Sequence, residues 1–211
     1  MNDLIARLHA VGIVPVVKIE HAKDAVPLAE ALKKGGSACA EITFRTDAAE
    51  DAIRAIHAAF PDFLIGAGTV LTEEQADRAM NAGASFIVCP GLDEDLVRYC
   101  MGKGYPIIPG VSTASEVARG LRLGLTYLKF FPAEQAGGVA MIKALAAPYR
   151  DVRFMPTGGV NTKNMADYLQ CKAVFACGGS WVVPPDAITG GDFGRIEKLI
   201  AETNAKRKEL L

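Results

Sequence analysis

The chain has 211 residues, of which 50% are hydrophobic and 22% charged, and its formal net charge is −1. This composition favours a single globular domain over residues 1–211, with enough apolar residues for a large core. No basic excess points to nucleic acid, and no apolar run is long enough to cross a membrane. The first residues lack the pattern of a secretory signal, so we expect a cytoplasmic protein.

The cysteines and histidines predict neither a disulfide framework nor a metal site. The five cysteines are odd in number, and no C-x-x-C occurs among Cys39, Cys89, Cys100, Cys171 and Cys177. We interpret them as small buried hydrophobic residues in a reducing cytoplasm. The three histidines lie apart from any cysteine or carboxylate cluster with ligand spacing, so we expect no metal and no cofactor.

Taken in chain order, the elements alternate between strand and helix. Short apolar runs typical of buried strands lie at residues 13–18, 38–44, 64–67, 86–89, 106–109, 127–131, 153–156 and 173–177. Amphipathic patterns predict helices at 3–10, 24–34, 47–59, 72–82, 93–103, 115–123, 138–147, 162–169 and 193–210. This repeat predicts an α/β fold with a parallel sheet, and eight units favour a closed (β/α)₈ TIM barrel over an open sheet. The helix at 3–10 should cap the bottom of the barrel.

Lys129 interrupts one of the strand-like runs. It stands between Leu128 and Phe130, in a short aromatic segment that reads as a buried strand. Lysine is almost never fully buried without a partner, because a desolvated ammonium is costly. A neutral amine is the cheaper state, and a neutral amine is a nucleophile. The alternative is a lysine on an edge strand whose ammonium reaches solvent.

A second set of polar residues lies at the end of the strand at 38–44. Side chains alternate along a strand, so Glu41, Thr43 and Arg45 share one face while Ile42 and Phe44 share the other. If the apolar face meets the helices, the charged face points into the barrel mouth, where such barrels place their active sites. A structural ion pair between Glu41 and Arg45 is the alternative.

Glycine-rich turns follow three of the predicted strands. Gly66–Gly68 precede Thr69, and small residues there would let a ligand approach the backbone and the hydroxyl. The last two strands end in the pairs Gly158-Gly159 and Gly178-Gly179, each just before a helix-start signal. Backbone N–H groups in such turns bind anions, and barrels place phosphates after these two strands. A buried amine, a carboxylate, an arginine and a phosphate cradle together suit Schiff-base chemistry on a phosphorylated keto compound.

These residues closely resemble the bacterial 2-keto-3-deoxy-6-phosphogluconate aldolases, also called 4-hydroxy-2-oxoglutarate aldolases, which are class I enzymes. The similarity runs from about residue 12 to residue 192. It is carried by matching segments at 41–46, 66–70, 89–92, 129–134, 156–159 and 178–181. The resemblance implies a homotrimeric barrel that needs no metal and that acts on a phosphorylated keto acid.

The resemblance also implies a role for each matching residue. Lys129 is similar to the Schiff-base lysine and Glu41 to the general acid/base. Arg45 and Thr69 correspond to ligands of the pyruvyl carboxylate. The remaining positions match the lining of that pocket (Pro90 and Phe131), the phosphate cradle (Gly158, Gly159, Gly178, Gly179 and Ser180) and a position linked with stereoselectivity (Thr157). The role of Lys18, which aligns with arginine in some relatives, stays open.

Other functions remain as alternatives. The resemblance favours cleavage of the gluco-configured phosphosugar acid, with 4-hydroxy-2-oxoglutarate and the galacto-configured acid as alternative substrates. A metal-dependent decarboxylase or epimerase would need a His, Asp and Glu cluster at the strand ends, where only Glu41 is found. A non-catalytic phosphosugar-binding barrel would keep the glycine turns but has no reason to hold Lys129 and Glu41 together.

Overall fold

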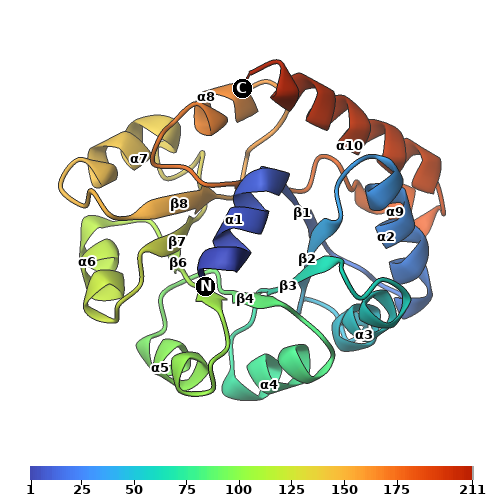
Figure 1. Cartoon of the computed structure of the whole chain (residues 1–211), viewed down its shortest axis with the longest axis horizontal. Helices are drawn as coiled ribbons and strands as arrows, with labels where there is room; N and C mark the ends of the chain where they lie inside the picture. The colour runs from blue at the N-terminus through green and yellow to red at the C-terminus, as the bar shows by residue number, and fades with distance from the viewer. Residues whose placement is uncertain (211) are drawn as a thin grey trace.

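The strands of the protein lie at its centre, and the helices surround them. The computed structural model describes residues 1–210, and Figure 1 shows this arrangement viewed along the strands from the side of helix α1. The strands are β1 (Ile13–Val17), β2 (Cys39–Thr43), β3 (Leu64–Gly68), β4 (Phe86–Val88), β5 (Ile107–Ile108), β6 (Gly110–Val111), β7 (Tyr127–Phe130), β8 (Arg153–Pro156) and β9 (Cys177–Gly179).

All the strand pairs are parallel, and they form two sheets. One sheet has the order β5-β4-β3-β2-β1-β9 and the other β6-β7-β8. Parallel neighbours need crossover connections, and helices supply them. The predicted α/β class is therefore confirmed, but the continuous ladders form two sheets rather than one eight-stranded ring. Isolated bridges link Phe154 to Val174 and Thr157 to Gly178, between β8 and the segment that contains β9.

The helices agree closely with their predicted positions. They are α1 (Asn2–Val11), α2 (Ala25–Lys34), α3 (Ala49–Ala59), α4 (Glu73–Asn81), α5 (Glu94–Gly102), α6 (Ala114–Arg122), α7 (Gly138–Ala146), α8 (Met165–Leu169), α9 (Pro185–Thr189) and α10 (Phe193–Lys208), with a 3₁₀ turn η1 (Ala22–Asp24). No helix within residues 1–210 is both long and apolar enough to span a membrane. The predictions missed α9, η1 and the separate strand β6.

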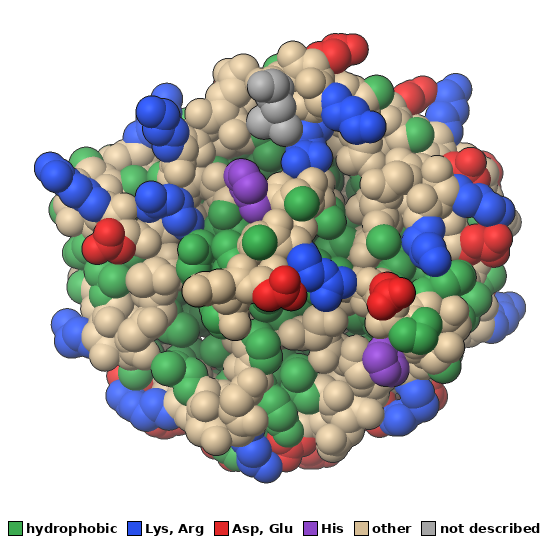
Figure 2. All heavy atoms as spheres, in the orientation of Figure 1, with side chains coloured by type: hydrophobic (Ala, Val, Ile, Leu, Met, Phe, Trp, Pro, Cys, Tyr) green, Lys and Arg blue, Asp and Glu red, His purple; other side chains and the backbone are tan. Residues whose placement is uncertain are grey.

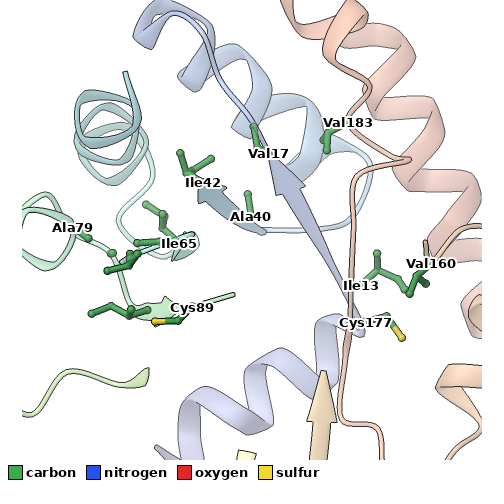
Figure 3. Close-up of a cluster of buried hydrophobic side chains, with 14 of the residues drawn as sticks. Ile13, Val17, Ala40, Ile42, Ile65, Ala79, Cys89, Val160, Cys177 and Val183 are labelled. Carbon is green, nitrogen blue, oxygen red and sulfur yellow. The ribbon is translucent and has the colours of Figure 1, made fainter. Parts of the chain in front are cut away.

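Buried hydrophobic side chains form two clusters, on the two faces of the strands. The larger cluster lies between strands and helices, and Figure 3 shows Val17, Ile42 and Ile65 among its members. The smaller cluster contains the inward-facing Val14, Phe86 and other residues together with Leu8 of α1. Alternation along each strand sends neighbouring side chains to the two clusters in turn. The space enclosed by the strands is thus filled with apolar side chains at the end covered by α1.

Helix α1 lies across one end of the strands, as Figure 1 shows. Its buried residues, Leu4, Ile5 and Leu8, pack into the smaller cluster, which is the capping position expected from the sequence. The outer surface on this side carries Lys, Arg, Asp and Glu side chains around its rim, with both signs interspersed (Figure 2). The opposite end of the strands, where their carboxyl termini lie, is left for the polar inward-facing residues.

The last strand begins later than expected. The prediction placed it at 173–177 with Gly178 and Gly179 in the turn after it, whereas β9 pairs both glycines with Val14 and Pro15 of β1. Glycine has a low preference for strands, so the pattern did not reveal them. Gly178 is required because a Cβ there would lie 2.4 Å from Thr157 Oγ1.

Candidate active site

The inward faces of β7 and β2 bring Lys129 and Glu41 together. Lys129 Nζ lies 3.4 Å from Glu41 Oε1, and the two residues are 4% and 0% exposed. Their chain neighbours Leu128 and Ile42 pack into the outer cluster, as strand alternation predicts. The separation is long for a charge-assisted hydrogen bond. The two groups are therefore near enough to share a proton through a small movement without forming a tight ion pair.

Glycine in β3 makes the room that Glu41 occupies. A Cβ on Gly68 would lie 2.2 Å from Glu41 Oε1, well inside contact distance. The second carboxylate oxygen, Oε2, is buried and has no hydrogen-bond partner among residues 1–210. A buried acceptor without a partner costs about 1–3 kcal/mol, which is a cost that functional sites often carry. Glu41 thus offers Oε1 to the lysine and Oε2 to another donor.

Arg45 stands at the rim above this pair and is oriented by Thr43. The Arg45 Nε donates to Thr43 Oγ1 at 3.1 Å, and the same hydroxyl donates to the Val17 carbonyl at 2.7 Å. Within residues 1–210, Arg45 makes no ion pair with a carboxylate, so its planar guanidinium is left for an anionic ligand. The predicted alternative of a Glu41–Arg45 ion pair is wrong, because Glu41 faces Lys129.

Thr69 has an unusual backbone conformation. Its φ is +56°, and it is the non-glycine residue with positive φ in the described chain. A β-branched residue is strained there, by about 1–3 kcal/mol, and such strain clusters at ligand sites. Thr69 follows β3 directly, beside Gly68, and lines the cavity at the carboxyl ends of the strands.

These side chains line one cavity of about 340 Å³. Of the site residues predicted from the sequence, all except Gly178 contribute to its wall. The lining consists of Val16, Glu41, Thr43, Arg45, Thr69, Pro90, Lys129, Phe131, Thr157, Gly158, Gly159, Val160, Gly179 and Ser180. Within it, Lys129 Nζ lies 5.3 Å from the centre of the Phe131 ring, a distance at which an aromatic face stabilises a cation.

Gly178, which was predicted to bind substrate, and Lys18, whose role was left open, lie outside the cavity. Three residues that line the cavity were not predicted. Gly178 is covered by the Thr157 side chain. Lys18 pairs with Glu20 at 2.6 Å and does not line the cavity. The missed residues are Val16, Thr43 and Val160. Strand alternation had placed Thr43 on the inward face, but no separate signal assigned it a role. Val16 lies two residues after the inward-facing Val14, so alternation along β1 would have placed it on the inward face too.

The turns after β8 and β9 present unused backbone donors. Gly158 and Gly159 have φ values of +100° and +82°, which glycine adopts at no steric cost. The N–H groups of Gly159, Val160 and Ser180 have no acceptor among residues 1–210. Converging free N–H groups bind anions. The predicted help from adjoining helix N-termini is wrong, because α8 begins only at Met165 and α9 at Pro185.

Cys89 is a second buried group of nucleophilic type near Lys129. Burial raises the pKa of the Cys89 thiol to about 12, although the nearby Lys129 acts in the opposite direction. A thiol with so high a pKa stays protonated at neutral pH and is a poor nucleophile. Of these two groups, the lysine amine is therefore the stronger candidate nucleophile.

All five cysteines are buried and unpaired in the described chain, as predicted. No group of three or more His, Cys, Asp or Glu side chains able to hold a metal occurs within residues 1–210. The donor set in the cavity is an amine, a carboxylate, a guanidinium, hydroxyls and backbone N–H groups. This set fits an organic anion with a carbonyl group.

Known proteins match this chain over nearly its whole length. The family profile described as KDPG and KHG aldolase matches residues 4–199. The 2-dehydro-3-deoxy-phosphogluconate aldolase of Treponema pallidum is 50% identical over 203 residues, covering 96% of this chain and 97% of that protein. The KDPG aldolase of Legionella pneumophila, solved with pyruvate captured at low pH as a covalent carbinolamine intermediate, superposes with a TM-score of 0.92 at 42% identity. It covers 95% of this chain and 97% of its own.

A second solved relative is the 2-keto-3-deoxy-6-phosphogluconate aldolase of Zymomonas mobilis with 3-phosphoglycerate. Its TM-score is 0.90 at 40% identity, with 96% of this chain and 95% of that chain covered. The matching family and relatives are aldolases, so the class that this fold and cavity belong to is that of carbon–carbon lyases. The chain belongs to the KDPG and KHG aldolase family and is an aldolase. A metal-dependent decarboxylase or epimerase and a non-catalytic barrel do not fit this family.

Proposed function

We propose that the protein cleaves 2-dehydro-3-deoxy-6-phosphogluconate to pyruvate and glyceraldehyde 3-phosphate through an imine on Lys129. The observation that carries the proposal is the 3.4 Å approach of Lys129 Nζ to Glu41 Oε1, with both residues buried. The aldolase named 2-dehydro-3-deoxy-phosphogluconate aldolase in Treponema pallidum supports the choice of substrate. The carbinolamine in the Legionella relative supports a covalent route.

The cycle begins with addition of the neutral Lys129 amine to the C2 carbonyl, and the carbinolamine loses water to give an iminium. Glu41 takes the proton of the C4 hydroxyl, and the C3–C4 bond breaks. The electron pair of that bond moves toward the iminium nitrogen, which leaves an enamine and releases the aldehyde. The Glu41 acid then returns a proton to C3, and water hydrolyses the iminium to pyruvate and free Lys129.

The rest of the cavity would hold the two ends of the substrate. Arg45 is the expected partner of the C1 carboxylate, because its fork can bind both oxygens at once. The Thr69 turn lies beside it, and Pro90 and Phe131 would enclose the pyruvyl group. The free N–H groups of the glycine turns are the expected phosphate cradle. Thr157, which also lines the cavity, is the proposed contact of the hydroxyl groups that set stereoselectivity.

Reductive trapping tests this proposal. Borohydride treatment in the presence of pyruvate should add one reduced pyruvyl group, on the peptide that contains Lys129. Lys18 provides the internal control, because it also follows an apolar strand yet lies outside the cavity. The Lys18→Ala variant should be labelled as fully as the wild type. Labelling on any other lysine, or no labelling, would refute the imine mechanism.

A second substrate, 4-hydroxy-2-oxoglutarate, is favoured by the layout of the cavity. The groups that would act on the keto acid, Lys129, Glu41 and Arg45, come from β7 and β2, whereas the free N–H groups follow β8 and β9. A keto acid without a phosphate could therefore be bound and cleaved by Lys129, Glu41 and Arg45 without the free N–H groups. Comparing kcat/KM for 4-hydroxy-2-oxoglutarate with kcat/KM for 2-dehydro-3-deoxy-6-phosphogluconate tests whether the unphosphorylated acid is a substrate. The galacto-configured acid is the remaining alternative, and its cleavage rate measured in parallel separates the two configurations.

We further propose that the two sheets are parts of one closed eight-stranded barrel and one domain spanning residues 1–211. β5 and β6 are separated only by Pro109, which has no N–H to continue a ladder. The bridges at Phe154–Val174 and Thr157–Gly178 support closure on the other side. Slow hydrogen exchange at the Phe154 and Phe175 amides, which bond across this join, is the expected result.

The proposed assembly is a homotrimer in the cytoplasm. Leu71 is 55% exposed beside a groove whose wall includes Val70, Leu92 and Leu96. An exposed apolar patch of this kind supports an interface between copies. Light scattering after size-exclusion chromatography should give three times the mass of one chain. The buried, unpaired cysteines support a reducing location.

A further inference from the structure

The glycine turn after β8 has both of its carbonyl groups held from outside the cavity. The Gly158 carbonyl accepts a hydrogen bond from the Glu134 backbone N–H at 3.0 Å. The Gly159 carbonyl accepts from the side-chain amides of Asn161 and Asn164, at 2.9 and 3.1 Å. A peptide group is planar, so holding a carbonyl on one side directs the N–H that follows it to the other side. The carbonyl contacts therefore determine where the free N–H groups point.

Asn164 holds the turn at two points. Its Nδ2 donates to the Gly159 carbonyl, while its Oδ1 accepts from the Asn161 backbone N–H at 2.8 Å. The Asn164 carboxamide thus bonds to both ends of the segment 159–161. Asn161 holds the residues that follow it, because its Oδ1 accepts a hydrogen bond from the Lys163 N–H. Neither asparagine lines the cavity, so neither is expected to touch substrate.

We propose that Asn164 is a positioning residue for the phosphate end of the substrate. By holding the Gly159 carbonyl away from the cavity, it keeps the Val160 N–H aimed at the same anion as the Gly159 N–H, whose own peptide carbonyl is held by Glu134. Gly159 has a positive φ and no side chain, so the turn has few other restraints. A preorganised donor set binds an anion without the cost of ordering it first. The inference rests on the proposed function, since it assumes that the glycine turns bind phosphate.

Asn204 offers a matched control. Its Nδ2 also donates to a glycine carbonyl, that of Gly35, at 3.0 Å. That contact lies near Ala10 and Val11, at the end of the strands covered by α1. Asn164→Leu and Asn204→Leu therefore remove the same kind of bond from the two ends of the molecule. If both bonds serve only stability, the two variants should lower the Tm alike and leave the kinetics unchanged.

The test measures KM and kcat for the phosphorylated substrate and for 4-hydroxy-2-oxoglutarate, and the inhibition of each reaction by inorganic phosphate. Asn164→Leu should raise KM for the phosphorylated substrate about tenfold, the size of one lost hydrogen bond. Its kcat and its kcat/KM for the unphosphorylated substrate should match the wild type. Inhibition by inorganic phosphate should weaken by the same factor. Asn204→Leu should change none of these values.

The outcomes separate the inference from the function on which it rests. Wild-type protein that neither prefers the phosphorylated substrate nor is inhibited by phosphate would refute the cradle and this inference together. A phosphate-sensitive wild type with equal KM values in both variants would refute the positioning role alone. Should Asn164→Leu fail to fold, Asn164→Ser is measured instead, because its hydroxyl can accept from Asn161 but is too short to reach the Gly159 carbonyl.

Discussion

The two carboxylate oxygens of Glu41 have different surroundings, and this difference suits a group that moves protons. Oε1 faces the Lys129 amine, while Oε2 is buried without a partner among the described residues. A purely structural ion pair would be expected to satisfy both oxygens, because a half-satisfied buried carboxylate is destabilising. A substrate hydroxyl is the donor that the proposed cycle brings to this position.

Replacing Glu41 by glutamine tests this role. Glutamine keeps the shape and hydrogen bonding but removes the base, so kcat should fall by roughly 10²–10⁴, the usual size of general-base catalysis. Steady-state kinetics and a thermal melt on the same preparation provide the measurement. A variant with near-wild-type kcat and a lowered Tm would show that the carboxylate is only a structural partner.

Thr43 should act on binding through Arg45. Thr43→Val is nearly the same shape but removes the hydroxyl that accepts from Arg45 Nε. We expect KM for the keto acid and the Kd of pyruvate to rise about three- to tenfold, while kcat changes little.

The control for that experiment is Thr46→Val. Thr46 also donates its hydroxyl to a backbone carbonyl, that of Ile19, but it does not line the cavity. Equal KM changes in the two variants would mean that Thr43 acts only through the fold.

At the scale of elements, the side chain of Glu41 on β2 requires glycine at position 68 of the neighbouring strand β3. Gly68→Ala keeps an ordinary backbone conformation but places Cβ where Glu41 Oε1 lies. Glu41 must then move away from Lys129, so kcat should fall at least tenfold, and overpacking should destabilise the protein by about 1–3 kcal/mol. Urea unfolding and kinetics measure the two effects.

Gly102, the last residue of α5, is the matched site. A Cβ there meets nothing within 4 Å, so Gly102→Ala should leave kcat unchanged and be neutral or slightly stabilising. Unchanged turnover in Gly68→Ala would contradict the placement of Glu41.

The elements that could be predicted are those whose local signals agree with their packing. The Thr72 side chain caps α4 by accepting from the Gln75 N–H, and Gln75 Oε1 accepts from the Leu71 N–H. β9 was misplaced because its glycines are selected by the neighbouring Thr157 and by the Trp181 ring beneath Gly179. Those contacts join residues through space, and a pattern along the chain does not contain them.

The same distinction applies to the candidate site. Strand alternation placed Glu41 on an inward face, and the apolar strand around Lys129 singled out that lysine. Their contact joins strands of the two sheets and follows from the fold. The support around them did not follow. Asn164 and Thr43 act through hydrogen bonds to particular backbone atoms, and such bonds depend on turn geometry that the residue types alone do not determine.

At the scale of the whole molecule, the proposed chemistry uses only side chains and backbone of the chain itself. No cluster of possible metal ligands occurs within residues 1–210, and the iminium supplies the electron sink. Prolonged treatment with excess EDTA should therefore leave the cleavage rate within error of the untreated protein. A loss of activity that zinc or manganese restores would contradict the imine route as the source of catalysis.

Helix α1 covers the end of the strands opposite the cavity. Leu4, Ile5 and Leu8 close the lower end of the strands over an apolar layer that includes Val14 and Phe86. Under the proposed cycle, the water that hydrolyses the last iminium must enter by the same mouth through which the aldehyde departs. The aldehyde leaves first, because the pyruvyl group stays covalently bound to Lys129 until water hydrolyses the iminium. Since α1 seals the far end, this water reaches the iminium through the mouth that the departing aldehyde has vacated.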